Sequence, residues 1–125
     1  MSERISFIEN PATGRQALLM DFSGFTTASD ALPFIHAARD VVGTQPARSL
    51  HGVVDVTGSK FNTHVVEALK ELAAHNAPFM IASGIVGVAG LQKVILDSVI
   101  AITGRSNLKA FPTRGDALSW LATQS

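Results

Sequence analysis

The sequence has no cysteine and no net charge, and each absence excludes a class of protein. Without cysteine there is no disulfide framework, no thiolate nucleophile and no zinc site built on cysteine. Ten Lys and Arg residues balance ten Asp and Glu residues, so the chain lacks the basic surface that binds nucleic acid or an anionic membrane. We therefore expect no nucleic-acid partner.

Charged residues are also scarce, at 16% of the sequence against about 25% in a typical soluble domain. An under-charged surface indicates that a partner, a second subunit or a ligand covers part of it. A compact α/β domain whose sheet is buried on both faces shifts the composition in the same way.

Long apolar segments are missing as well. The amino-terminal stretch is interrupted by Glu3, Arg4 and Pro11 and does not resemble a signal peptide, so we expect a cytoplasmic protein. The most apolar stretch, residues 84–102, carries Lys93 among other polar residues. Inserting a charged residue into a bilayer costs about 2.5–3.5 kcal/mol, which offsets the gain from the aliphatic residues. We expect no membrane span.

The length of 125 residues fits one domain, residues 1–125, and hydrophobic periodicity predicts its elements. The predicted strands are 5–8, 17–22, 50–56, 79–83 and 108–111. The predicted helices begin at Ser29/Asp30, at Asn62 or Thr63, at Leu91 and at Arg114, and they end near Gly43, Asn76, Thr103 and Ala122. The order ββαβαβαβα predicts an α/β fold: a mostly parallel sheet, covered by helices, with an antiparallel first strand at its edge.

Several segments together carry a family resemblance. They are V-V-D-V-T-G, V-E-A-L-K-E-L-A-A-H-N, F-M-I-A-S-G-I-V-G-V-A-G, L-Q-K-V-I-L-D-S-V, T-G-R and A-F-P-T-R-G-D-A-L-S-W-L. Between residues 21 and 121 the chain resembles the small bacterial SpoIIAA-like domains, which share their fold with STAS modules and, more distantly, with the lipid-exchange domains of the CRAL-TRIO group. The resemblance implies a single α/β domain used for binding or regulation, without an established enzymatic activity or cofactor.

The resemblance also draws attention to Thr63. STAS anti-anti-sigma proteins carry a phosphorylatable serine in an Asp-Ser pair at the start of the helix that follows a D-x-[ST]-G strand end. Asp55, Thr57 and Gly58 match that strand end, but the Asp-Ser pair is absent and Thr63 is the hydroxyl at the corresponding place. Thr63 is thus a candidate phospho-acceptor, although helix capping by Asn62 or Thr63 explains these residues sufficiently.

Two loops are candidate ligand sites because ligands of open α/β sheets bind beyond the carboxyl ends of the strands. One runs from Thr57 to Asn62, and we single out Thr57, Gly58, Ser59 and Asn62. The other contains Gly84, Gly87 and Gly90, whose spacing matches neither the dinucleotide fingerprint nor the P-loop. Close backbone packing is the favoured interpretation of these glycines.

No spacing predicts a catalytic or metal site. His64 and His75 share a helix but lie eleven residues apart in the sequence, too far for one metal ion. His36 and Asp40 are spaced for a contact on one helix, which is typical of a solvated pair. We therefore expect no metal site and no enzyme.

The predicted helix 91–103 has two aliphatic residues, Leu96 and Ile100, that point away from its sheet-facing stripe. They pack against a neighbouring helix of the same chain, or they contact a second subunit or an apolar ligand. From these patterns we expect a non-enzymatic binding or regulatory domain with a protein partner, including a second copy of itself. The alternative is a carrier or sensor of a small apolar, lipid-like ligand.

Overall fold

The computed structural model describes residues 3–60, 62–88, 97 and 107–124. Its strands are β1 (Ile5–Glu9), β2 (Gln16–Asp21), β3 (Leu50–Asp55), β4 (Met80–Val86) and β5 (Leu108–Phe111). Its helices are α1 (Ala28–Gly43), α2 (Thr63–Asn76), the short 3-10 helix η1 (Ala77–Phe79) and α4 (Arg114–Leu121). The predicted helix 91–103, with Leu96 and Ile100, lies outside the described residues except for Asp97, which is helical and exposed.

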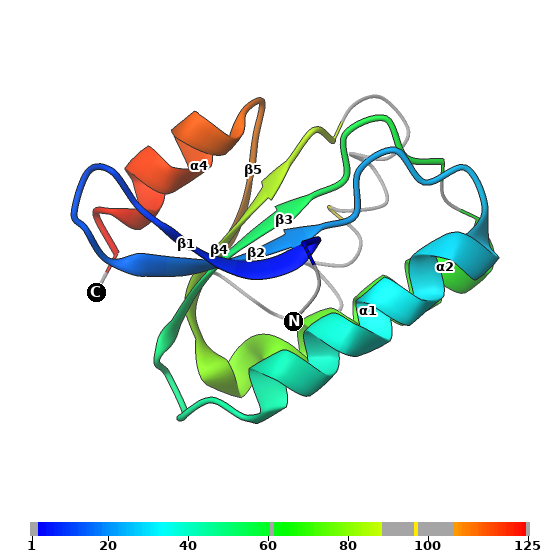
Figure 1. Ribbon diagram of the computed structural model, residues 1–125, viewed down its shortest axis with the longest axis horizontal. Coiled ribbons are helices and arrows are strands. Elements are labelled where there is room, and N and C mark those ends of the chain that lie inside the picture. Colours follow the sequence, from blue (N-terminus) through cyan, green and yellow to red (C-terminus); the bar gives the residue numbers. More distant parts are fainter. Residues whose placement is uncertain (1–2, 61, 89–96, 98–106, 125) are drawn as a thin grey trace.

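The five strands form one sheet in the order β1-β2-β3-β4-β5 (Figure 1). β1 pairs with β2 in antiparallel fashion at the edge, and the pairs β2–β3, β3–β4 and β4–β5 are parallel. The predicted mixed α/β sheet is therefore confirmed.

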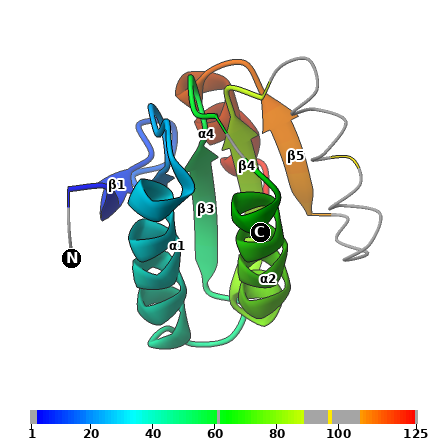
Figure 2. The same ribbon diagram turned by 90° about the vertical axis from the view of Figure 1, so that its right-hand side faces the viewer.

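Two hydrophobic cores cover the two faces of this sheet. α1 and α2 lie side by side on one face and α4 lies on the other (Figure 2). The larger core joins α1 and α2 to the sheet through side chains such as Leu18, Ile35 and Val65. The smaller core joins α4 to the sheet through Val53 and Leu121, which are both fully buried. Successive side chains of β3 point to opposite faces of the sheet, so this one strand contributes residues to both cores.

The first helix begins earlier than the sequence indicated. Thr27 has an extended backbone, and its hydroxyl accepts a hydrogen bond from the Asp30 N–H at 3.3 Å, so Thr27 caps α1 rather than Ser29 or Asp30. Ser29 and Asp30 are therefore helical residues, and Pro33 lies beyond the first turn of α1. Threonine, serine and aspartate are all favourable N-cap residues, and the apolar periodicity alone does not choose among them.

The fourth strand differs most from its predicted bounds of 79–83. Phe79 belongs to η1, and β4 continues through Gly84 to Val86. Gly84 was expected to end the strand, but its missing side chain makes room for α4. A Cβ at Gly84 would lie 2.9 Å from the Ala117 Cβ and 3.3 Å from Cδ2 of Phe111.

This close approach predicts that Gly84→Ala destabilises the fold by about 1–3 kcal/mol, because α4 must move away from β4. Gly115→Ala, in α4, is the control, because the added Cβ would make only an ordinary contact, at 3.8 Å from Oγ1 of Thr113. Replacing a helical glycine by alanine should stabilise by up to about 1 kcal/mol. Urea unfolding measures both, and a Gly84→Ala protein as stable as the wild type would refute the packing argument.

Candidate functional site

Two aspartates end neighbouring strands at the carboxyl edge of the sheet. Asp21 of β2 and Asp55 of β3 are partners in the parallel register. Each uses one carboxylate oxygen, Oδ1, to accept hydrogen bonds from the residue two positions later. Asp21 accepts from the Ser23 N–H at 3.0 Å and hydroxyl at 2.5 Å. Asp55 accepts from the Thr57 N–H at 2.9 Å and hydroxyl at 2.6 Å. The two strand ends therefore carry the same turn.

The same turn follows from a short sequence repeat, D-F-S-G at residues 21–24 and D-V-T-G at residues 55–58. The glycine that closes each turn, Gly24 or Gly58, has φ of 72°. This left-handed conformation strains other residues, which explains why glycine occupies the fourth position of the repeat. We call residues 21–24 and 55–58 the twin turns.

Arg114 joins the twin turns. Its Nε donates to Oδ2 of Asp55 at 2.7 Å, and its Nη2 lies 3.4 Å from Oδ2 of Asp21. Thr113 positions this arginine, because its hydroxyl accepts from the Asp116 N–H at 3.1 Å and makes Arg114 the first residue of α4. One guanidinium therefore connects α4 to the ends of two strands.

The ion pair shifts the pKa values of its partners in opposite directions. Burial raises the pKa of Asp55, but the hydrogen bonds from Thr57 and the Arg114 guanidinium outweigh it and lower the pKa overall. For Arg114, burial lowers the pKa and the Asp55 and Asp21 carboxylates raise it, so that the net shift is upward. Asp55 is therefore held ionised and fully engaged, which suits a structural tie and not a general acid.

A second arginine, Arg4, makes contacts at the same edge of the sheet. Its guanidinium carbon lies 4.2 Å from the ring centre of Phe25 and 5.5 Å from that of Phe34. One of its nitrogens donates to the carbonyl oxygens of Asp21 at 3.2 Å and Ser23 at 2.9 Å. Arg4 thus ties the start of the chain to the first twin turn and to α1.

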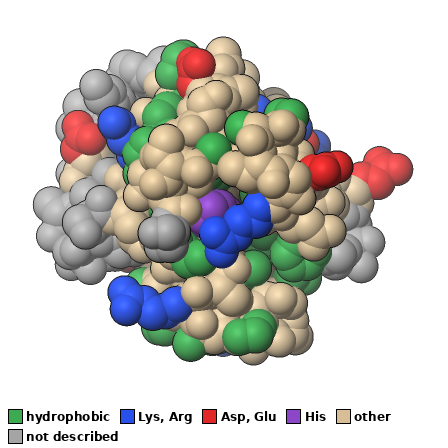
Figure 3. Space-filling model, turned by 90° about the vertical axis from the view of Figure 1, so that its left-hand side faces the viewer, with side chains coloured by type: hydrophobic (Ala, Val, Ile, Leu, Met, Phe, Trp, Pro, Cys, Tyr) green, Lys and Arg blue, Asp and Glu red, His purple; other side chains and the backbone are tan. Residues whose placement is uncertain are grey.

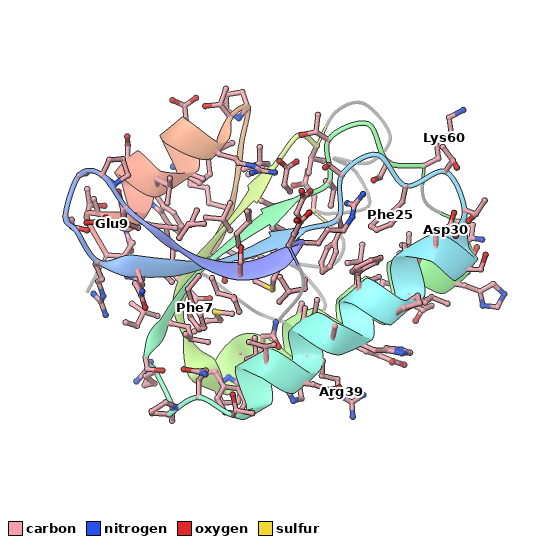
Figure 4. All side chains as sticks on the ribbon, viewed as in Figure 1. Phe7, Glu9, Phe25, Asp30, Arg39 and Lys60 are labelled. Atoms are coloured by element: carbon pink, nitrogen blue, oxygen red, sulfur yellow. The ribbon has the colours of Figure 1, made fainter. Side chains whose placement is uncertain are left out.

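The loops that continue from the twin turns are bonded to each other. The Gly24 N–H donates to the Thr57 carbonyl at 3.0 Å, and the Phe25 N–H donates to the Ser59 hydroxyl at 2.9 Å. The Lys60 N–H then donates to the Phe25 carbonyl at 2.8 Å. Ser59 is buried with 3% exposure, whereas Thr57, Gly58 and Lys60 are exposed. Figure 4 shows Phe25 and Lys60 on this edge of the molecule.

The glycine loop after β4 packs directly against the second twin turn. Gly87 has φ of 84°, and a Cβ there would lie 2.0 Å from Oγ1 of Thr57. The two predicted ligand loops thus meet at Thr57 and Gly87, and close packing accounts for this glycine. Gly84 lies within β4 and not in the loop, and Gly90 lies outside the described residues.

The structure shows which of the two candidates, Asn62 or Thr63, caps α2. Asn62 has an extended backbone, and its Oδ1 accepts from the Val65 N–H at 3.0 Å, so Asn62 is the N-cap. Thr63 is the first residue of the helix and is exposed. Its candidacy as a phospho-acceptor stays a prediction.

Within residues 3–60, 62–88, 97 and 107–124, no group of three or more His, Asp or Glu side chains is arranged to hold a metal ion. Over the same part of the chain, no helix is long and apolar enough to cross a membrane.

Sequence reasoning missed Arg4, Asp21 and Arg114. The repeat of D-x-[ST]-G at the ends of two predicted strands was a usable signal for Asp21, because parallel strands bring their carboxyl ends together. The arginines offered no such signal, since they meet the aspartates through contacts between residues far apart in the sequence, 59 positions for Arg114 and Asp55.

Comparison with known proteins adds the fold class. No family model and no curated protein matches the chain. A crystal structure of an uncharacterised DUF3478-family protein from Shewanella loihica, with a SpoIIAA-like fold, superposes with a TM-score of 0.68. It is 18% identical, and the match covers 97% of this chain and 98% of that one. The chain therefore has a SpoIIAA-like fold, as its sequence motifs indicated.

The ion pair predicts that Asp55→Asn lowers the unfolding free energy at neutral pH. The Asn oxygen can still accept from Thr57, so the substitution removes mainly the contact with Arg114, where a donating NH2 group replaces the accepting carboxylate oxygen. Hydrogen bonds to charged groups contribute about 1.5–3 kcal/mol, and Arg114 is 41% exposed, so screening by solvent reduces the expected loss to about 1 kcal/mol. Denaturant unfolding measures it, with the exposed Asp40→Asn as control. Equal stability of the wild type and Asp55→Asn would contradict the structural role.

The lowered pKa of Asp55 also determines the pH range in which the wild type and Asp55→Asn become equally stable. The carboxylate's contribution is complete above the ordinary pKa of 3.8 and is lost as the pH falls through the lower folded-state pKa. The stability gap between wild type and Asp55→Asn should therefore stay constant from about pH 7 to pH 5 and shrink below about pH 4. Unfolding curves across this range measure the gap, and a gap that closes above about pH 5 would assign it to another group.

Proposed function

We propose that this chain is a non-enzymatic binding or regulatory domain that recognises a protein partner through the carboxyl edge of its sheet. The observation that carries the proposal is the Arg114 bridge, which ties together two turns whose ends, Gly24 and Thr57–Gly58, are exposed. A preorganised surface loses little conformational freedom on binding, and this favours affinity.

The composition of this edge supports protein recognition over catalysis. Its exposed residues are mostly small and uncharged, and they come from the twin turns, the two loops after them and the start of α2: Gly24, Thr26, Thr27, Thr57, Gly58, Lys60, Asn62 and Thr63. The two carboxylates at its floor are already bonded to arginine and hydroxyl groups. A general acid or base needs a group whose proton is available near neutral pH, and the lowered pKa of Asp55 does not provide one.

The alternative function, transport or sensing of a small apolar ligand, requires a large apolar cavity. The groove between α1 and α2, lined by Ile35, Arg39, Ala68 and Leu72 among others, has room for about 10 Å³. This space suits about one water molecule. The groove therefore gives no support to a carrier role.

Site-specific photo-crosslinking in the native cells tests the proposal. A benzophenone amino acid replaces Lys60 at the carboxyl edge and, as a matched control, Ala47, which is exposed in the turn before β3. We expect a discrete protein adduct from position 60 and none from position 47, because the partner covers one edge of the sheet. Both substitutions replace exposed side chains, so both variants should fold.

Two results would contradict the proposal. Adducts of the same pattern from both positions would indicate chance encounters. The absence of any adduct, together with an apolar molecule retained in native mass spectrometry of the purified protein, would favour the carrier alternative.

A further inference from the structure

The outer edge of β1 has no strand beside it in the part of the chain that the structure describes. β1 is the first strand of the sheet and pairs with β2 only, and Figure 2 shows it at the rim of the sheet. The Asp21 N–H donates to the Arg4 carbonyl at 2.7 Å, and the Asn10 N–H donates to the Arg15 carbonyl at 2.8 Å. Bonded and non-bonded pairs alternate along an antiparallel ladder, so the even-numbered residues of β1 bond to β2 and the odd-numbered ones direct their N–H and C=O groups outward.

This edge lacks the features that usually prevent a further strand from pairing. Native proteins commonly protect an edge strand with proline, lysine or a bulge. β1 reads I-S-F-I-E and contains neither proline nor lysine, and its register with β2 runs from Ile5 to Glu9 without a shift. Among the described residues, the outward N–H and C=O groups of Phe7 and Glu9 have no hydrogen-bond partner. An extended chain offers matching donors and acceptors, so a strand is the partner that fits this edge.

An apolar surface lies beside the same edge. Phe7 is half-buried against the larger core, and Figure 4 shows it on the side of the sheet where α1 lies. Three half-buried residues share one stripe of α1: Phe34, Ala37 and Val41. His36 and Arg39 line the groove toward α2, and at about 100° per residue the stripe lies on the opposite flank of the helix, toward β1. Figure 3 views the end of the molecule that carries the β1–β2 turn and shows hydrophobic side chains at the surface among few charged ones.

We propose that a second copy of this chain occupies this edge, and that the two β1 strands pair in antiparallel fashion about a two-fold axis beside Phe7. Phe7 of each copy then faces Phe7 of the other, and each Phe7 N–H donates to the Phe7 carbonyl across the axis. Ser6 faces Ile8 of the other copy. The two sheets continue as one, with both α1 helices on the same side.

The strand is its own complement in this register, which favours a second copy over an unrelated strand. A two-fold interface requires a surface that fits itself. The register about Phe7 pairs the whole of Ile5–Glu9 with the same segment of the other copy. Odd-numbered residues face odd-numbered residues, so every side chain keeps its side of the sheet and the apolar surface on the α1 side becomes continuous.

The charges at the two ends of β1 are also complementary. Glu9 is exposed and makes no ion pair with a described residue. The register places it opposite Ile5 of the other copy, next to Arg4. The Arg4 guanidinium lies 5.5 Å from the Phe34 ring, and the Arg4 side chain is 34% exposed. The two-fold axis therefore brings an acidic and a basic side chain together twice.

Sedimentation equilibrium of the full chain tests the proposal. We expect the wild type to have about twice the chain mass of 13.2 kDa at high micromolar concentration. Phe7→Lys places like charges beside the axis and should weaken the dimer by about a hundredfold or more. Val66→Lys, at a half-buried position of α2, makes the same change of charge and is the matched control, which should remain a dimer. Circular dichroism shows whether both variants are folded.

A cross-link keeps the inference testable if Phe7→Lys does not fold. The chain has no cysteine, so introduced cysteines report the register. Ser6 and Ile8 of the other copy form a non-hydrogen-bonded pair with Cα atoms about 4.5 Å apart, which is within the range for a disulfide. Under mild oxidation, a mixture of Ser6→Cys and Ile8→Cys should form the mixed disulfide faster than either variant alone forms its own.

Three results would overturn the proposal. The first is a wild type that stays monomeric at every concentration. The second is a dimer that survives Phe7→Lys in a folded protein, and the third is a mixed disulfide that forms no faster than the two symmetric ones. Either of the last two would assign the contact to another surface.

Discussion

The guanidinium of Arg114 is the point on which the carboxyl edge depends. It meets Asp55 at 2.7 Å and Asp21 at 3.4 Å, and through them it connects α4 with the ends of β2 and β3. The planar, always charged guanidinium can face two carboxylates at once, which a lysine ammonium does less well. An unpaired carboxylate at the Asp55 position would be costly, because that residue is 6% exposed. The main role of the ion pair is therefore to pair a carboxylate that is already buried, and its contribution to net stability is secondary.

Parallel pairing explains why one arginine reaches both aspartates. The register places Asp21 beside Asp55, and each carboxylate uses Oδ1 for its own turn, which leaves Oδ2 for Arg114. The same turns direct the following loops toward each other, where main-chain bonds join them. Local turn chemistry, strand register and a long-range ion pair thus produce one rigid surface, and this rigidity is what supports a role in recognition.

The sequence predicted the elements of the fold because those elements have periodic signals. Alternating and helical apolar patterns identified the strands and helices, and a helix-length crossover between strands indicated parallel pairing. The predicted ends of strands and helices were less accurate where the same residue type can occur either inside an element or at its end. Gly84 was expected to end a strand, yet it lies inside β4 because α4 packs against it. Thr27, and not Ser29 or Asp30, caps α1 because several neighbouring side chains are capable of capping.

The candidate site was less predictable for a different reason. The loops around Thr57 and Gly87 were identified from their place after strands, and the structure brings them together. Arg4 and Arg114 lie in segments that gave no functional signal, since their partners are distant in the sequence and are chosen by the folded chain. The repeat D-F-S-G and D-V-T-G was visible in the sequence, but its meaning depends on knowing that the two strands are neighbours.

The central claim is that one arginine holds both twin turns, and backbone dynamics test it most directly. Amide exchange at Ser23 and Thr57 can be compared between the wild type and Arg114→Gln under conditions in which both are folded. The account predicts that the two amides lose protection together, because both turns share the bridge. Loss at one turn alone, or unchanged protection at both, would contradict it.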